Sequence, residues 1–228
     1  MIKTVLLDID DTILDFHAAQ DIALPSTFRE LGIEPTEEVM RRYNEINREG
    51  WQMLERGEIT RDEVVLRRFR ILFAELGRAE LDPRDTWSIY EDKLSRIHTF
   101  IHGALELLEA LFGKYELYVV SNGTATVQDR RIAESGIGKY FKKMFISERV
   151  GYDKPSREFF DFCFKNIANF SREETIIIGD SLTSDIQGGI NAGILTCHYN
   201  PKGIRSDKIA PDYEVASLSE IPSLLKSI

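Results

Sequence analysis

The stretch Thr4–Phe16, TVLLDIDDTILDF, joins a strand pattern to a cluster of acids. The run Thr4–Leu7 is apolar enough for a buried strand, yet Asp8, Asp10 and Asp11 follow at once. A buried carboxylate costs several kcal/mol unless it is paired or binds a metal. Asp is also common in solvated turns at strand ends. The choice between a turn and a site depends on whether the rest of the chain supplies partners for these acids.

Composition bounds the class of protein. A chain of 228 residues with 43% hydrophobic and 29% charged residues is long enough and mixed enough for a globular protein with a real core. The formal net charge of -9 argues against a nucleic-acid polymer as partner, although it allows a small anionic substrate. We interpret Cys163 and Cys197, each inside an apolar run, as buried free thiols in a reducing compartment. The apolar run from Val5 stops at Asp8, too early for a signal peptide, so we expect a cytoplasmic protein that does not bind membranes.

The chain changes texture twice. After the first strand, four amphipathic helical patterns occupy about residues 17–31, 37–56, 60–76 and 84–98, and the third opens on the capping box Thr60–Glu63. From about residue 100, apolar strand patterns alternate with helices, which predicts a parallel sheet covered on both faces. We therefore predict an α/β fold with a doubly wound, Rossmann-like sheet built from residues 1–14 and 99–228. Residues 15–98 form an inserted all-helical domain of four-helix-bundle type.

Polar residues follow several of the predicted strands. In a doubly wound sheet, ligands bind beyond the carboxyl ends of the strands. Two unit charges 4 Å apart repel by about 4 kcal/mol at an effective dielectric near 20, so one lysine cannot balance four acids there. A hard divalent cation with oxygen ligands can, and Mg²⁺ is usual where a phosphate supplies further ligands. The residues at this edge are Asp8, Asp10, Ser121, Asn122, Lys154, Asp180 and Asp185, with Lys154 expected at the start of a helix.

Four segments resemble the four ordered motifs of the haloacid dehalogenase superfamily. They are DIDDT at Asp8–Thr12, VVSNG at Val119–Gly123, DKPSREFF at Asp153–Phe160 and IIGDSLTSD at Ile177–Asp185. The match spans the chain, including a helical cap inserted after the first motif. The resemblance implies a hydrolase that forms an aspartyl-phosphate on its first aspartate and uses Mg²⁺ as cofactor.

The resemblance also implies a role for each motif residue. Asp8 would be the nucleophile and a metal ligand, and Asp10 would be the general acid–base and would ligate the metal through its backbone carbonyl. Thr12, Ser121, Asn122 and Lys154 would hold the phosphoryl oxygens, and Lys154 would also neutralise Asp8. Asp180 would bind Mg²⁺ directly, and Asp185 would act from the second shell of the metal or through Lys154.

Asp10 narrows the chemistry. Relatives that cleave carbon–halogen bonds lack this second acid, because no leaving alkoxide needs a proton. Ion-pumping relatives carry Thr there and are far longer, and a silent binding protein would have lost at least one of Asp8, Asp10, Lys154 or Asp180. A phosphatase is therefore expected. A phosphomutase similar to β-phosphoglucomutase stays open, because it keeps both acids.

The substrate is expected to depend on the helical insertion. The segment Tyr43–Phe69, YNEINREGWQMLERGEITRDEVVLRRF, and the stretch LDIDDTILDF look like the pyrimidine 5′-nucleotidase branch. That resemblance implies a nucleoside 5′-monophosphate phosphatase that prefers pyrimidines, with His17, Asn47 and Trp51 as candidate substrate residues. Trp51 fits a core position as well as a stacking position, and phosphoglycolate or sugar phosphates are alternative substrates. We expect a monomer or weak homodimer acting on a small phosphate monoester.

Overall fold

The computed structural model describes all residues, Met1 to Ile228, and its chain divides into two compact units. The α/β unit contains Met1–Phe16 and His98–Ile228, and the helical unit contains His17–Ile97. The two connecting segments run side by side within the α/β unit: Asp15 N donates to Thr99 O over 2.8 Å, and Ile101 N donates to Ile13 O over 3.0 Å.

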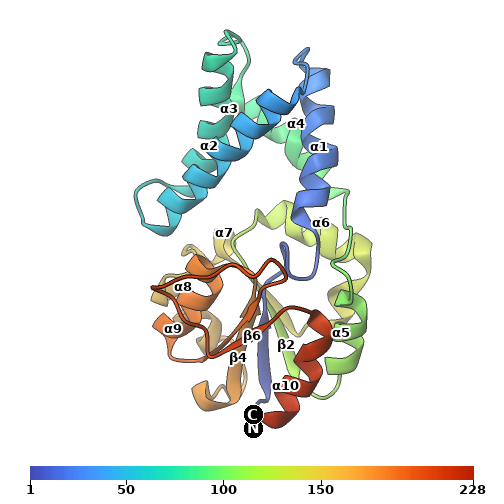
Figure 1. The fold of residues 1–228 in the computed structure, drawn as a ribbon, viewed down its shortest axis with the longest axis vertical. Helices are drawn as coiled ribbons and strands as arrows, with labels where there is room; N and C mark the ends of the chain where they lie inside the picture. Colours follow the sequence, from blue (N-terminus) through green and yellow to red (C-terminus); the bar gives the residue numbers. More distant parts are fainter. The chain divides into compact units, whose positions relative to one another are not determined.

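The α/β unit is built on one six-stranded sheet in the order β3-β2-β1-β4-β5-β6, with every neighbouring pair parallel. In Figure 1, helices lie on both sides of this sheet, which confirms the predicted doubly wound α/β fold. The strands are β1 (Thr4–Leu7), β2 (Glu116–Ser121), β3 (Lys143–Ile146), β4 (Thr175–Gly179), β5 (Leu195–Tyr199) and β6 (Tyr213–Val215). The helices are α5 (Ala104–Leu111), α6 (Ala125–Ser135), α7 (Ser147–Val150), α8 (Arg157–Lys165), α9 (Gln187–Ala192) and α10 (Ile221–Ser227).

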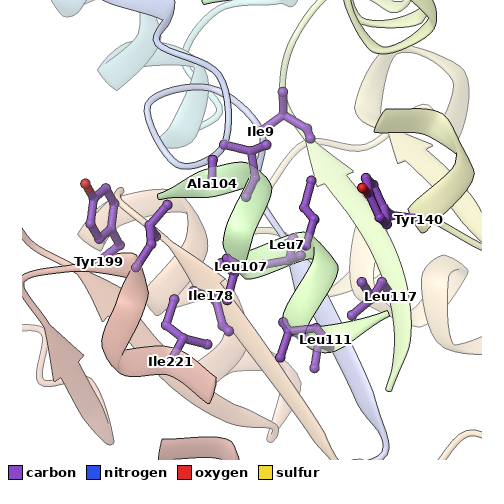
Figure 2. Close-up of a cluster of buried hydrophobic side chains, with 14 of the residues drawn as sticks. Leu7, Ile9, Ala104, Leu107, Leu111, Leu117, Tyr140, Ile178, Tyr199 and Ile221 are labelled. Carbon is purple, nitrogen blue, oxygen red and sulfur yellow. The ribbon is translucent and has the colours of Figure 1, made fainter. Parts of the chain in front are cut away.

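Alternate residues of the strands feed two separate cores, as strand geometry requires. Figure 2 shows Leu7 of β1 in one core with Leu107 and Leu111 of α5 and Ile221 of α10. The neighbouring residue, Leu6, faces the other core, which it shares with aromatic side chains of α8. Because both faces are buried, β1 is apolar from Val5 to Leu7, and a charged residue can enter only where the strand ends.

The helical unit consists of four helices with an aromatic core. They are α1 (Phe16–Glu30), α2 (Glu37–Glu55), α3 (Arg61–Glu75) and α4 (Pro83–Ser95). The predicted capping box is present, with Thr60 and Glu63 bonded reciprocally at the start of α3. The ring of Tyr43 lies 5.6 Å from that of Phe69, whose ring lies 6.1 Å from that of Tyr90, so three helices share one packed cluster.

Two sequence expectations need correction. Lys154 does not begin a helix, because it lies in the loop between α7 and α8, and Ser156 caps the latter by accepting from Phe159 N. The sequence also left β6 and α10 unpredicted. No helix of the structure is both long and apolar enough to cross a membrane.

Candidate active site

The strand register brings the candidate residues to one edge of the sheet. Leu7 pairs with Val119 of β2 on one side and with Ile178 of β4 on the other. The next residue, Asp8, continues the ladder by donating its N–H to Ile178 O over 3.0 Å. The chain places β2 and β3 on one side of β1 and then crosses to β4 on the other side, and such switch points form ligand sites in open α/β sheets. Asp8 therefore follows the strand at the place where the fold favours a ligand.

A buried ammonium joins two of the acids. Lys154 Nζ donates to Asp8 Oδ1 over 2.7 Å, to Asp185 Oδ1 over 2.6 Å and to Val120 O over 2.8 Å. Lys154 and Asp185 are each only 1% exposed. All three ammonium protons are thus used, which is the condition for keeping a lysine charged in a low-dielectric interior.

The acids outnumber this cation, and their proton affinities reflect it. Burial raises the pKa of Asp8 to about 8, against the attraction of Lys154 and with the repulsion of Asp185 and Asp10 added. Burial and the repulsion of Asp8 and Asp185 raise the pKa of Asp180 well above its usual range. Burial lowers the pKa of Lys154, but the attraction of Asp185 and Asp8 outweighs it, so the pKa is raised overall. Protein charges alone do not balance this cluster.

The same acids have the donor set of a divalent cation site. One carboxylate oxygen from each of Asp8, Asp180 and Asp185 lies within 4.8 Å of the others. Oxygen ligands at this spacing suit a hard cation such as Mg²⁺, whose charge would reverse the pKa shifts. Gly179 makes the arrangement possible, since a Cβ there would lie 2.3 Å from Asp185 Oδ2. The side chain of Asp10 is not part of this group.

The expected phosphate-binding residues Ser121, Asn122 and Thr12 differ in what their side chains contact. Ser121 Oγ accepts from Gly123 N and from Gln128 Nε2, each over 3.0 Å, which leaves its own proton to donate to a ligand. The Asn122 side chain instead holds the backbone of Lys154, because Oδ1 accepts from Lys154 N and Nδ2 donates to Lys154 O, both over 2.8 Å. Thr12 is fully buried and its hydroxyl lies 3.4 Å from Asp180 Oδ1. Asn122 thus orients Lys154, and Thr12 faces an expected metal ligand.

Sequence reasoning missed two residues of α6. Gln128 Nε2 donates to Asp10 Oδ2 over 2.5 Å, and Arg131 Nη1 bonds to Asp10 Oδ1. Both side chains are buried, while that of Asp10 is 26% exposed. The available signal was the spacing of the two residues, since positions three apart share one face of a helix. Arg131 is fully buried, and Asp10 is the acid that this face of the helix meets.

The three candidate substrate residues all lie at or beyond the start of the helical unit. His17 is exposed in the first turn of α1. Asn47 Oδ1 accepts from Arg68 Nη1 over 2.6 Å, which directs the Asn47 amide hydrogens away from Arg68. Trp51 is half-buried on α2, with the guanidinium of Arg61 5.7 Å from its ring centroid. Neither Asn47 nor Trp51 is among the fully buried residues of the core.

Comparison with known proteins places the whole chain. Residues 5–198 match the family model of haloacid dehalogenase-like hydrolases. The HAD-hydrolase YfnB of Bacillus subtilis is 42% identical over 98% of this chain and 95% of its own. The pyrimidine 5′-nucleotidase PynA of Streptococcus pneumoniae is 39% identical over 96% of this chain and 93% of its own. The pyrimidine 5′-nucleotidase YjjG of Escherichia coli is 31% identical over 97% of this chain and 96% of its own.

Solved structures agree with the sequence comparison. A crystal structure of YfnB from Bacillus subtilis, bound to magnesium, superposes with a TM-score of 0.93 at 41% identity and covers 98% of both chains. An L-2-haloacid dehalogenase from Xanthobacter autotrophicus superposes with a TM-score of 0.77 at 17% identity, which shows a shared fold. The prediction of the superfamily is confirmed, and so is the prediction of an enzyme. This chain belongs to the haloacid dehalogenase-like hydrolase family.

Proposed function

We propose that this protein is a Mg²⁺-dependent phosphatase that hydrolyses small phosphate monoesters through an aspartyl-phosphate on Asp8, with pyrimidine nucleoside 5′-monophosphates as preferred substrates. The observation that carries the proposal is the buried Lys154, bonded to both Asp8 and Asp185 beside a third carboxylate. The acids outnumber this ammonium, so a divalent cation bound by them would provide the positive charge that an anionic phosphoryl group needs at this point.

Asp8 serves as the nucleophile in this proposal. Lys154 keeps the Asp8 carboxylate in place and offsets its charge as an anionic phosphoryl group approaches. Asp8 and Asp180, supported by Asp185, would hold Mg²⁺, which would supply positive charge for the phosphoryl oxygens. The hydroxyl of Ser121 donates to one of these oxygens, since its lone pairs are already occupied. Asn122 acts by orienting Lys154.

Asp10 serves as the acid–base in both half-reactions. In the first, Asp8 attacks phosphorus, the bond from phosphorus to the ester oxygen breaks, and protonated Asp10 gives its proton to the leaving alkoxide. In the second, ionised Asp10 takes a proton from water as the water oxygen attacks phosphorus. The bond from phosphorus to Asp8 then breaks and releases phosphate, with Asp10 protonated again.

The substrate class rests on the relatives and on the helical unit. Two relatives that align over nearly the whole chain are named pyrimidine 5′-nucleotidases. We propose that the helical unit, about residues 15–98, acts as the specificity domain through His17, Asn47 and Trp51. The Asn47 amide, turned by Arg68 so that its hydrogens point away, suits a carbonyl acceptor such as those of a pyrimidine. Trp51 offers a ring on which a base can stack.

A panel of phosphate monoesters tests this proposal. Phosphate release is measured with Mg²⁺ and with EDTA for uridine, cytidine, thymidine, adenosine and guanosine monophosphates, phosphoglycolate and sugar phosphates. We expect kcat/KM to be highest for the pyrimidine nucleotides and EDTA to abolish release.

Two results contradict parts of the proposal separately. A preference for phosphoglycolate or sugar phosphates would remove the nucleotidase assignment and leave the phosphatase. Interconversion of sugar phosphates without phosphate release would identify a phosphomutase.

A further inference from the structure

The side chain of Asp10 is held entirely by α6. Its Oδ2 accepts from Gln128 Nε2 over 2.5 Å, and its Oδ1 accepts from Arg131 Nη1. Gln128 is 1% exposed and Arg131 is 0% exposed. Both carboxylate oxygens are therefore occupied by donors from rigid, buried side chains. The Asp10 carboxylate cannot rotate without breaking one of these bonds.

Gln128 also connects Asp10 to Ser121. Its Nε2 donates to Ser121 Oγ over 3.0 Å as well as to Asp10, and its Oε1 lies 3.4 Å from Arg131 Nη1. Gly123 leaves room for this amide, because a Cβ at Gly123 would lie 2.3 Å from Gln128 Nε2. One amide thus sets the distance between the Asp10 carboxylate and the Ser121 hydroxyl.

The two buried cations of the site serve different acids. The three hydrogen bonds of the Lys154 ammonium go to Asp8, Asp185 and a backbone carbonyl, and none goes to Asp10. Arg131 meets Asp10 instead. A buried ion pair is weak evidence for stability, since an apolar pair of similar volume often serves the fold equally well. We therefore expect the main role of Arg131 to be its effect on the position of the Asp10 carboxylate.

We propose that Gln128 and Arg131 are positioning residues that hold the Asp10 carboxylate and the Ser121 hydroxyl in one fixed arrangement. This inference rests on the proposed function, in which Asp10 is the acid–base and Ser121 binds a phosphoryl oxygen. Both partners of Asp10 donate hydrogen bonds, one to each carboxylate oxygen, so together they fix the orientation of the group. Misplacement by about 1 Å can cost on the order of 10²-fold in rate.

The test is a double-mutant cycle with matched controls. Arg131→Met and Gln128→Leu are made alone and in an Asp10→Asn background, together with Arg131→Lys and the control Arg130→Met. Arg130 lies on the same helix and pairs with Glu134 at the surface. For each variant we measure the melting temperature, kcat and KM for uridine 5′-monophosphate, and the nitrophenolate burst with p-nitrophenyl phosphate.

We expect Arg131→Met to lower kcat for uridine 5′-monophosphate by about 10- to 100-fold with KM within about threefold. The nitrophenolate burst should change much less, because this leaving group needs little protonation. In the Asp10→Asn background Arg131→Met should cause little further loss, since the group that it positions is already disabled. Arg131→Lys should recover part of the rate, and Arg130→Met should behave as wild type.

Three results overturn the inference. One is an equal loss from Arg131→Met with and without Asp10→Asn, and another is an equal loss of burst and steady-state rates. The third contradicting result is full activity of a folded Gln128→Leu enzyme. If Arg131→Met does not fold, the same double-mutant cycle is measured with Gln128→Leu. Wild-type activity of Asp10→Asn itself would instead contradict the proposed acid–base role, so the two failures are distinguishable.

Discussion

Each of the two units buries charged side chains, but in opposite ways. In the α/β unit, buried Lys154 and Arg131 each bond to acids at the ends of strands. In the helical unit, buried Arg68 has no acid partner. Its guanidinium lies 4.8 Å from the ring centroid of Trp87 and within 5.6 Å of three further rings. Its hydrogen bonds go to Asn47 and to a backbone carbonyl.

The difference indicates what each unit is built to do. Aromatic faces and one amide can stabilise a single buried cation, so the groups around Arg68 carry no charge of their own. At Asp8, Asp180 and Asp185 the acids outnumber the cations, and this leaves an excess of negative charge that a bound cation must neutralise. The α/β unit therefore carries the chemistry in our proposal, and the helical unit carries selectivity. The predictions below test this division, beginning with the largest expected effect.

The largest expected effect comes from replacing the proposed nucleophile, Asp8, in the α/β unit. Asp8→Asn should lower turnover of every phosphate monoester by on the order of 10⁴-fold or more, because the neutral amide cannot form the aspartyl-phosphate. Circular dichroism should show an intact fold, since the two side chains are nearly isosteric. Asp11→Asn is the matched control: its φ of 59° suits Asn, and an amide oxygen can still accept from Phe16 N. Substantial activity in Asp8→Asn would refute Asp8 as the nucleophile.

Metal addition measures the charge imbalance directly. Mg²⁺ at 100 times its dissociation constant should stabilise the folded enzyme by about 2.7 kcal/mol, which is roughly 5–10 °C in melting temperature. Asp180→Asn should reduce this shift sharply, because it removes one of three carboxylates. Asp161→Asn, which changes a surface acid paired with Arg172, should keep the full shift. A shift that survives Asp180→Asn would place the metal elsewhere.

The two tryptophans of the helical unit separate selectivity from packing. Trp51→Ala should raise KM for uridine 5′-monophosphate by about 5- to 150-fold, because base stacking contributes roughly 1–3 kcal/mol. Turnover of p-nitrophenyl phosphate should hardly change. Trp87→Ala, which removes a ring beside Arg68, should lower the melting temperature without a selective rise in KM. If Trp51→Ala slows all substrates alike and destabilises the fold, Trp51 belongs to the core.

Most of the fold was predictable because its signals are local. The run Val5–Leu7 is apolar, as is typical of a strand buried on both faces, and the capping box at Thr60 marks a helix start by itself. The strand Tyr213–Val215 escaped prediction because it is three residues long and lies at the sheet edge. The prediction of Lys154 at a helix start was wrong by a few residues, because the N-cap of that helix is Ser156.

The sequence by itself determined which residues are candidates for the chemistry, because the acids, the lysine and the serine follow recognisable strand patterns in a fixed order. Only the tertiary structure decided which of these residues contact one another. Asn122 holds the backbone of Lys154 across 32 positions, and Arg131 reaches Asp10 across 121. Such pairings depend on strand order and on which helix face meets the sheet edge. Their spacing places Gln128 and Arg131 on one face of α6, but no local pattern encodes their pairing with Asp10.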